Sequence, residues 1–161
     1  MLVHGEPRAM KSYQSLEIAL ALTTQTPAFN LPRFSVPKAV PVMYISQEDP
    51  ARLVRKRLKL LLQGRALLYN RPFPYPKLLH VSCQNDLNLD NEAWCTTLAH
   101  ELKTLGIKLL ILDPIRRFSS NVDQGPGEVA VLPTRLRKIC SASGTTIMIV
   151  HHDVNAGREQ D

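Results

Sequence analysis

The chain has 161 residues, of which 44% are hydrophobic and 21% charged, and its formal net charge is +6. This length and composition are typical of one globular domain with its own core, so we expect a single domain over residues 1–161. Three separated cysteines without a C-x-x-C pair argue against a disulfide framework or a zinc site. No signal peptide is recognisable and no apolar run approaches the ~20 residues that span a bilayer, so we expect a cytoplasmic protein without a membrane partner.

Short apolar runs alternate with longer segments of helical periodicity. In chain order, the sequence predicts a strand at residues 1–3, a helix from 11 to about 24, a strand at 40–45 and a helix at 50–63. It then predicts a strand at 78–82, a helix from about 92 to 105, a strand at 107–112, a helix within 128–141 and a strand at 145–150. The fourth and fifth strands are almost continuously apolar, as strands buried on both faces of a parallel sheet are.

Local signals predict where the helices begin and end. The second helix has Asp49 as N-cap, Pro50 at its first position and Gly64 just past its end. The third is expected to stop at Gly106, and the fourth contains Pro133, which starts or kinks it. Apolar residues at helical spacing predict the buried face of two helices. In the third helix it comprises Trp94, Leu98, Leu102 and Leu105, and in the second Leu53, Val54, Leu58, Leu61 and Leu62.

This strand–helix alternation predicts an α/β domain with a mostly parallel sheet flanked by helices. Ligands of such sheets bind at the carboxyl ends of the strands, so the residues that follow each strand are the candidates for a site.

The segment after the first strand, "GEPRAMKS", approaches the phosphate-binding pattern G-x-x-x-x-G-K-[ST]. Gly5, Lys11 and Ser12 are in register with the pattern, but Met10 occupies the second glycine position. Backbone N–H groups and the dipole of the following helix would face phosphates, with Lys11 neutralising them and Ser12 ligating Mg²⁺. The predicted nucleotide-binding residues are Gly5, Glu6, Pro7, Arg8, Ala9, Met10, Lys11, Ser12 and Tyr13.

The other strand ends carry acids and histidines. Glu48 follows the second strand, Asp113 the fourth, and His151 the fifth. Asp113 is expected to hold magnesium through water, Glu48 to polarise the attacking water as general base, and His151 to hydrogen-bond the γ-phosphate. The ordered set predicts a site for ATP and Mg²⁺.

The motifs "GEPRAMKS", "YISQEDPARLVRKRL", "LLILDPIRRFSS" and "TTIMIVHHD" together resemble the RecA-like P-loop ATPases of the RepA-type replicative helicase group, related to DnaB-like and RadA-like ATPases. The likeness runs from residue 3 to about 157. It implies that Lys11 and Ser12 bind phosphate and magnesium, Glu48 is the catalytic acid, Asp113 the Walker B residue and His151 the γ-phosphate sensor. It further implies ATP hydrolysis in a homo-oligomeric ring, usually a hexamer, that acts on DNA.

The chain departs from this family's pattern at three places. Met10 replaces a glycine, which we interpret as a variant loop, and Pro133 interrupts a helix that is normally continuous. The chain also ends soon after His151, so the resemblance implies a RecA-like core without its usual C-terminal strands and their arginine. A truncated nucleotide-binding module with little or no hydrolysis, acting through protein contacts, is the alternative function. A small-molecule kinase is disfavoured, because neither an arginine-rich lid nor a substrate-binding insertion is visible.

Other polar clusters have simpler readings. The His151–Asp153 run is not expected to bind a metal, because adjacent residues of a strand point to opposite faces. Polar loops at 119–128 and 155–161 lie where RecA-like proteins contact single-stranded DNA, although they hold a single cation, Arg158. The second helix bears the basic cluster Arg52, Arg55, Lys56, Arg57 and Lys59, by default a solvated face, with phosphate contact or a subunit interface as alternatives.

Overall fold

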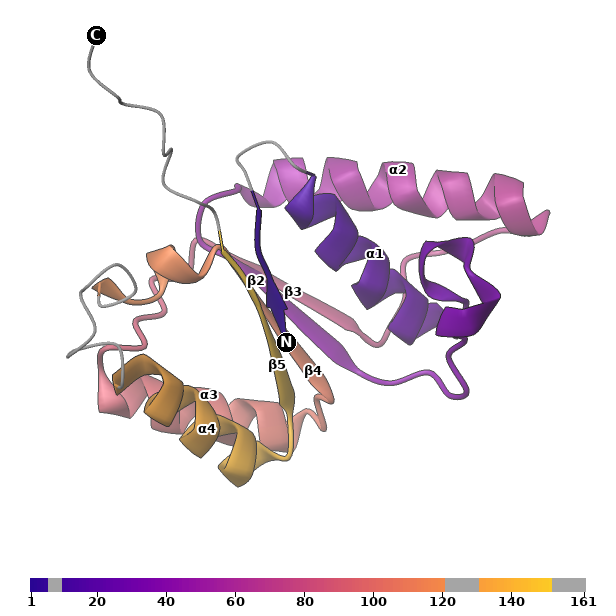
Figure 1. The fold of residues 1–161 in the computed structure, drawn as a ribbon. Coiled ribbons are helices and arrows are strands. Elements are labelled where there is room, and N and C mark those ends of the chain that lie inside the picture. The colour runs from indigo at the N-terminus through magenta and orange to yellow at the C-terminus, as the bar shows by residue number, and fades with distance from the viewer. Residues whose placement is uncertain (6–9, 121–130, 152–161) are drawn as a thin grey trace, which may run out of the picture.

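A computed structural model describes residues 1–5, 10–120 and 131–151. Five parallel strands form one sheet: β1 (Leu2–Val3), β2 (Val42–Ser46), β3 (Leu79–Cys83), β4 (Leu109–Asp113) and β5 (Thr146–Val150), in the order β1-β5-β4-β2-β3. Helices α1 (Lys11–Thr24) and α2 (Ala51–Tyr69) cover one face, and α3 (Glu92–Thr104) and α4 (Val131–Ser143) the other (Figure 1). The predicted α/β fold with a parallel sheet flanked by helices is confirmed and is consistent with a RecA-like P-loop core. Three 3-10 turns complete the described elements: η1 (Ala28–Asn30), η2 (Pro32–Phe34) and η3 (Ile115–Arg117).

The strand pairing aligns the carboxyl ends of the strands in one row. Ser46 of β2 pairs with Cys83 of β3 on one side and with Asp113 of β4 on the other. On β1 and β5, Val3 pairs with Val150. The residues that follow β1, β2, β4 and β5 therefore emerge at the same edge of the sheet.

Two apolar clusters, one on each face of the sheet, form the core. Alternate residues of β4 serve both: Ile111 packs with α1 and α2, and Leu110 and Leu112 pack with α3 and α4. All five residues of β4 are buried, as the continuous apolar run predicted. No helix in the described part of the chain is long and apolar enough to cross a membrane.

Helix α2 differs from its prediction at both ends. Pro50 has extended backbone angles and precedes the first helical residue, and no side chain caps the helix. The predicted N-cap, Asp49, instead forms an ion pair with Arg57 of the same helix. The helix also continues through Gly64 to Tyr69. Interior glycine costs about 1 kcal/mol relative to alanine, and the packing beyond it outweighs that cost.

The prediction of the buried face of α3 was wrong at its two ends. Trp94 and Leu105 are each 40% exposed, and the buried face consists of Cys95, Leu98, Ala99 and Leu102. The predicted stop at Gly106 is correct: its φ is +64°, and Ile107 N donates to Leu102 O at 2.9 Å across the helix end. Pro133 is the third residue of α4 and does not break it, because first-turn N–H groups have no partner within a helix.

Candidate functional site

The start of α1 holds a buried cation. The Lys11 side chain is only 4% exposed, and its Nζ donates a hydrogen bond to Gly5 O at 2.5 Å. The ammonium group therefore lies against Gly5, two residues after β1, at the N-terminal end of α1, where the helix dipole is positive. Of the predicted nucleotide-binding residues, the structure describes Gly5, Met10, Lys11, Ser12 and Tyr13, whereas Glu6, Pro7, Arg8 and Ala9 lie outside the described residues.

The backbone conformation of Met10 shows why the phosphate-loop pattern has glycine at this position. Its backbone is left-handed, with φ 57° and ψ 21°, and it precedes the first residue of α1 without a side-chain cap. Glycine adopts this conformation without steric cost, whereas other L-residues incur about 1–2 kcal/mol. The Met10 side chain is 59% exposed, so most of it lies in solvent.

Asp113 lies on the same face of the sheet as α1. It ends β4 two residues after Ile111, which packs against α1 and α2, and strand residues two apart share a face. Tyr44 of β2 donates a hydrogen bond from its hydroxyl to Asp113 Oδ2 at 2.7 Å, and both residues are almost wholly buried. Burial, followed by the neighbouring Asp113 charge, raises the pKa of Tyr44 well above its ordinary value, which keeps the phenol protonated as a donor.

A chain of contacts links the end of β2 to α1. The Asp49 backbone N–H donates to Ser46 Oγ at 3.1 Å, and the Asp49 carboxylate forms an ion pair with Arg57 of α2. The Arg57 guanidinium lies 5.6 Å from the centre of the Tyr13 ring in α1, a cation–π distance. Glu48, between these partners, is exposed to solvent.

His151 follows β5 and extends its pairing with β1. Its backbone N–H donates to Val3 O at 2.9 Å. The imidazole stacks on that of His4, with ring centroids 5.6 Å apart and an interplanar angle of 29°. His152 and Asp153 lie outside the described residues, as do residues 121–128 of the predicted DNA-contacting segment 119–128 and the whole of segment 155–161.

The sheet order sets the spacing between these groups. One strand, β5, separates β1 from β4, so the row that ends at Asp113 lies about 10 Å from the row that ends at Val3, at about 4.8 Å per strand. His151 leaves the strand between them, and Glu48 follows β2 on the far side of β4. A lysine, a helix N-terminus and carboxylates at one edge can bind an anion together with a divalent cation.

Sequence reasoning missed three contributors to this edge: Tyr44, Arg57 and His4. Tyr44 left a signal, because a tyrosine in a strand buried on both faces needs a partner for its hydroxyl. Arg57 was counted in the basic cluster of α2, but nothing in the sequence indicated its contact with Tyr13. No pattern distinguished His4.

A polar cavity of about 480 Å³ lies beside the end of β2. The exposed guanidinium groups of Arg116 and Arg117 line it, and its remaining lining includes Gln47, Asn88, Ser119 and Ser120. Partial burial of Asp90 opposes its ionisation, but hydrogen bonds from Ser119 and Ser120 hold the pKa of Asp90 below its ordinary value. The cavity therefore combines the hydrogen-bonded Asp90 carboxylate with two exposed guanidinium groups.

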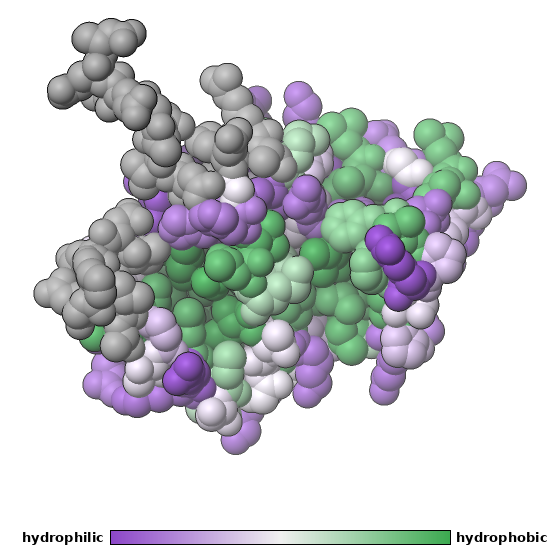
Figure 2. Space-filling view, in the orientation of Figure 1, coloured by the Kyte–Doolittle hydropathy of each residue, from purple (hydrophilic) through white to green (hydrophobic). Residues whose placement is uncertain are grey.

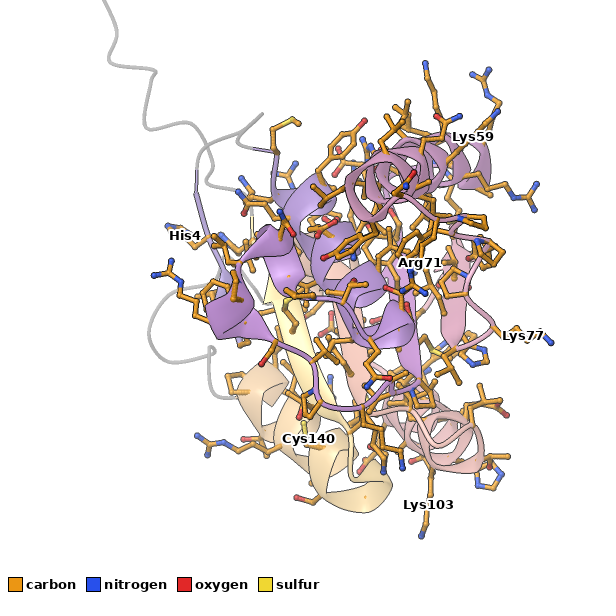
Figure 3. The ribbon with its side chains drawn as sticks, turned by 90° about the vertical axis from the view of Figure 1, so that its right-hand side faces the viewer. His4, Lys59, Arg71, Lys77, Lys103 and Cys140 are labelled. Carbon is orange, nitrogen blue, oxygen red and sulfur yellow. The ribbon has the colours of Figure 1, made fainter. Side chains whose placement is uncertain are left out.

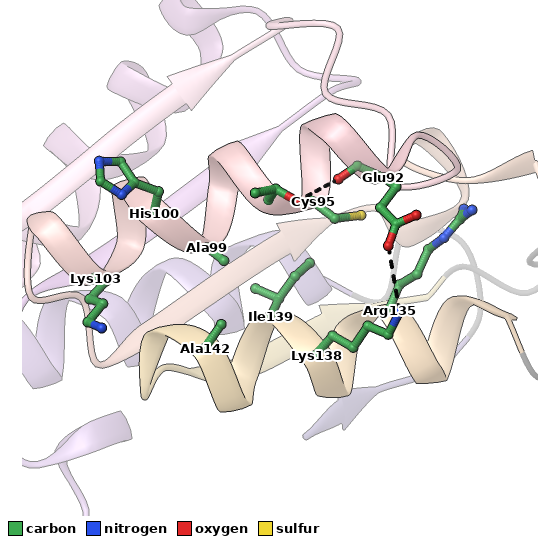
Figure 4. Close-up of a pocket in the computed structure, with 10 residues that line it drawn as sticks. Glu92, Cys95, Ala99, His100, Lys103, Arg135, Lys138, Ile139 and Ala142 are labelled. Carbon is green, nitrogen blue, oxygen red and sulfur yellow. Dashed lines mark hydrogen bonds and ion pairs between the residues drawn. The ribbon is translucent and has the colours of Figure 1, made fainter.

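A separate groove of about 300 Å³ lies between α3 and α4 (Figure 4). Its floor is apolar, and an ion pair of 3.6 Å between Lys138 Nζ and Glu92 Oε1 lies at its rim. Burial raises the pKa of the Cys95 thiol in this groove, so the thiol is poorly suited to nucleophilic chemistry. None of the predicted site residues lines it.

Comparison with known proteins gives the family. No curated protein matches the chain. A family model described as an AAA domain matches residues 1–158, nearly the whole chain, and membership of that family indicates a nucleotide-binding ATPase. The chain belongs to the AAA domain family.

Proposed function

We propose that the chain binds ATP with Mg²⁺ at the N-terminus of α1 and hydrolyses it. The observation that carries the proposal is the buried ammonium of Lys11 at a helix N-terminus, on the sheet face where Asp113 is also buried. A buried cation at the positive end of a helix dipole favours a multiply charged anion such as a polyphosphate. Lys11 would exchange its hydrogen bond to Gly5 O for bonds to phosphate oxygens.

The residues present fit a magnesium ion bound with the nucleotide. Mg²⁺ prefers oxygen donors, keeps several waters and takes one or two protein ligands when phosphates supply the rest. Ser12 offers a hydroxyl, and Asp113 a carboxylate whose orientation Tyr44 fixes. Among the described residues no group of three or more His, Cys, Asp or Glu side chains could form an all-protein metal site. Bound with ATP, the ion would neutralise charge on the β- and γ-phosphates.

Glu48 and His151 take the remaining roles in this proposal. Glu48 is exposed, so water reaches its carboxylate, and it acts as general base. His151, which adjoins the end of β1, hydrogen-bonds the γ-phosphate and responds to its loss. Its stacking on His4 would couple that response to the loop that begins at Gly5.

The finer proposal is that the chain forms a hexameric ring, as RepA-type helicases do, and couples ATP hydrolysis to work on DNA. Arg116 and Arg117 support it, because both are exposed at the polar cavity beside the end of β2. Glu48 directly follows Gln47, which lines the same cavity. Phosphates of single-stranded DNA at these arginines would therefore lie close to the proposed general base.

Phosphate release measured with and without single-stranded DNA tests this function. We expect magnesium-dependent ATPase activity that DNA stimulates and that Lys11→Ala abolishes. The double variant Arg116→Ala/Arg117→Ala should lose the DNA stimulation but keep the basal activity. For its binding to single-stranded DNA, the slope of log affinity against log salt concentration should fall in magnitude by about 1.4, because two phosphate contacts are lost. Arg137→Ala, an exposed arginine of α4, is the matched control. Activity that persists in Lys11→Ala would overturn the proposed site, and stimulation that survives the double variant would overturn the DNA surface.

A further inference from the structure

The outward face of α2 carries a row of exposed leucines. Leu53, Leu60 and Leu67 recur every seven residues and are 36%, 50% and 85% exposed. Gly64 lies beside the row, and Leu68, at its end, is 53% exposed. At 1.5 Å per residue the row extends over about 21 Å. Single exposed leucines are ordinary, but an aligned row marks an interaction surface.

One side of this row is strongly basic. Helix α2 contains six Lys or Arg residues and no acidic residue. Arg57 pairs with Asp49 and Arg65 with Glu17. The other four cations are exposed and form no ion pair among the described residues: Arg52, Arg55, Lys56 and Lys59. Figure 3 shows Lys59 at the outer surface of the helix, and polar and apolar groups lie side by side along the upper edge of Figure 2, where α2 lies.

Helical geometry makes the leucine row narrow. At about 100° per residue, Leu53, Leu60 and Leu67 fall within about 40° of one another, with Lys56 and Arg52 about 60–100° to one side of Leu53. The buried face, which includes Val54 and Leu58 but, contrary to the sequence prediction, not Leu53, is turned toward the sheet. A narrow row of heptad spacing fits a single helix lying alongside, whereas membrane binding requires a broad apolar face.

We propose that the leucine row of α2 binds an amphipathic helix of another protein, whose apolar side chains meet the leucines and whose side next to Arg52 and Lys56 is acidic. The acidic side follows from charge, because the four cations without an ion pair among the described residues all lie on one side of the row and α2 has no carboxylate to offset them. A second copy of α2 in antiparallel orientation fits poorly, since it would bring the two basic sides together. This surface is independent of the proposed nucleotide site.

The test uses a synthetic helix of about 21 residues with leucine at every seventh position, glutamate on both flanks and alanine elsewhere. Its binding to the purified chain is followed by fluorescence anisotropy. We expect saturable binding that weakens with salt, and about tenfold or greater loss in Leu60→Gln/Leu67→Gln and in Lys56→Glu/Lys59→Glu. Leu105→Gln, which changes an exposed leucine on the other side of the sheet, should stay within twofold. Circular dichroism should give the same unfolding temperature for all variants, because each substituted side chain is exposed.

Four outcomes would overturn the proposal. A second peptide carries lysine in place of glutamate, and equal binding of the two peptides would refute the proposal that the partner is acidic. Absence of saturable binding would refute the docking surface. Self-association of the chain in sedimentation velocity that Leu60→Gln/Leu67→Gln abolishes would assign the row to a second copy. Binding to vesicles with about 30% anionic lipid, lost in the same variant, would assign it to a membrane surface.

Discussion

The hydrogen bond from Tyr44 to Asp113 should contribute measurably to stability. Tyr44→Phe removes the hydroxyl that lies 2.7 Å from Asp113 Oδ2 and leaves the ring volume unchanged, so no cavity forms. Hydrogen bonds to charged groups contribute about 1.5–3 kcal/mol. For a chain of this length, 1 kcal/mol corresponds to about 2–4 °C in Tm. We therefore expect a loss of about 2 kcal/mol and a Tm lower by about 4–8 °C.

A double-mutant cycle isolates the bond from other effects. Urea unfolding of wild type, Tyr44→Phe, Asp113→Asn and the double variant should give a coupling energy of about 1–3 kcal/mol. Tyr75→Phe is the control, because Tyr75 is 50% exposed and its substitution should cost less than about 0.5 kcal/mol. A coupling energy near zero would refute the reasoning, since the two side chains would then not depend on each other.

Three further predictions follow from the site. Met10→Gly should raise the free energy of unfolding by about 1 kcal/mol and keep or improve ATP affinity, because it relieves the left-handed backbone; urea unfolding and calorimetry measure both, and tenfold weaker binding would contradict it. Glu48→Gln should lower ATPase turnover by about 10²–10⁴ with ATP affinity within a few fold, whereas Asp49→Asn should weaken its pairing with Arg57 at a cost of up to about 1 kcal/mol in stability and little turnover; the reverse pattern would make Asp49 the general base. The pKa of Asp90 is lowered from its ordinary value of 3.8, so the Asp90 charge stabilises the fold at pH values above 3.8, and this contribution is lost as the pH falls through the folded-state pKa. The unfolding free energy of wild type minus that of Asp90→Asn should therefore be largest at pH 7 and shrink below pH 3.8. A difference that stays constant with pH would contradict this.

The sequence was sufficient to predict the layers of the fold. Strands β4 and β5 were recognisable because a parallel strand covered on both faces is apolar at every position. The end of α3 at Gly106 was recognisable because the chain there needs a left-handed residue. The length of α2 was not, because Gly64 satisfies the same local rule for a helix end, and only packing of later residues such as Arg65 against Glu17 carries the helix past it.

For the candidate site, the sequence predicted position but not contacts. Lys11 comes after β1 and Asp113 ends β4, and parallel strands bring their carboxyl ends to one edge whatever the side chains do. The bond between Tyr44 and Asp113 joins residues 69 apart in the chain, and no local spacing encodes it. The same holds for Arg57 over Tyr13, which requires α1 and α2 to lie side by side on one face of the sheet.

The most direct test of the nucleotide site is a calorimetric titration of ATP with magnesium into wild type and Lys11→Ala. Lys11 is the buried cation at the start of α1, so its loss should remove several kcal/mol of charge-assisted bonding, about a hundredfold or more in affinity. Gln14→Ala, an exposed substitution one turn further along the same helix, should leave the affinity unchanged. Saturable binding to wild type that Lys11→Ala abolishes is the predicted result. Equal affinity of wild type and Lys11→Ala would contradict the assignment of this loop as a phosphate site.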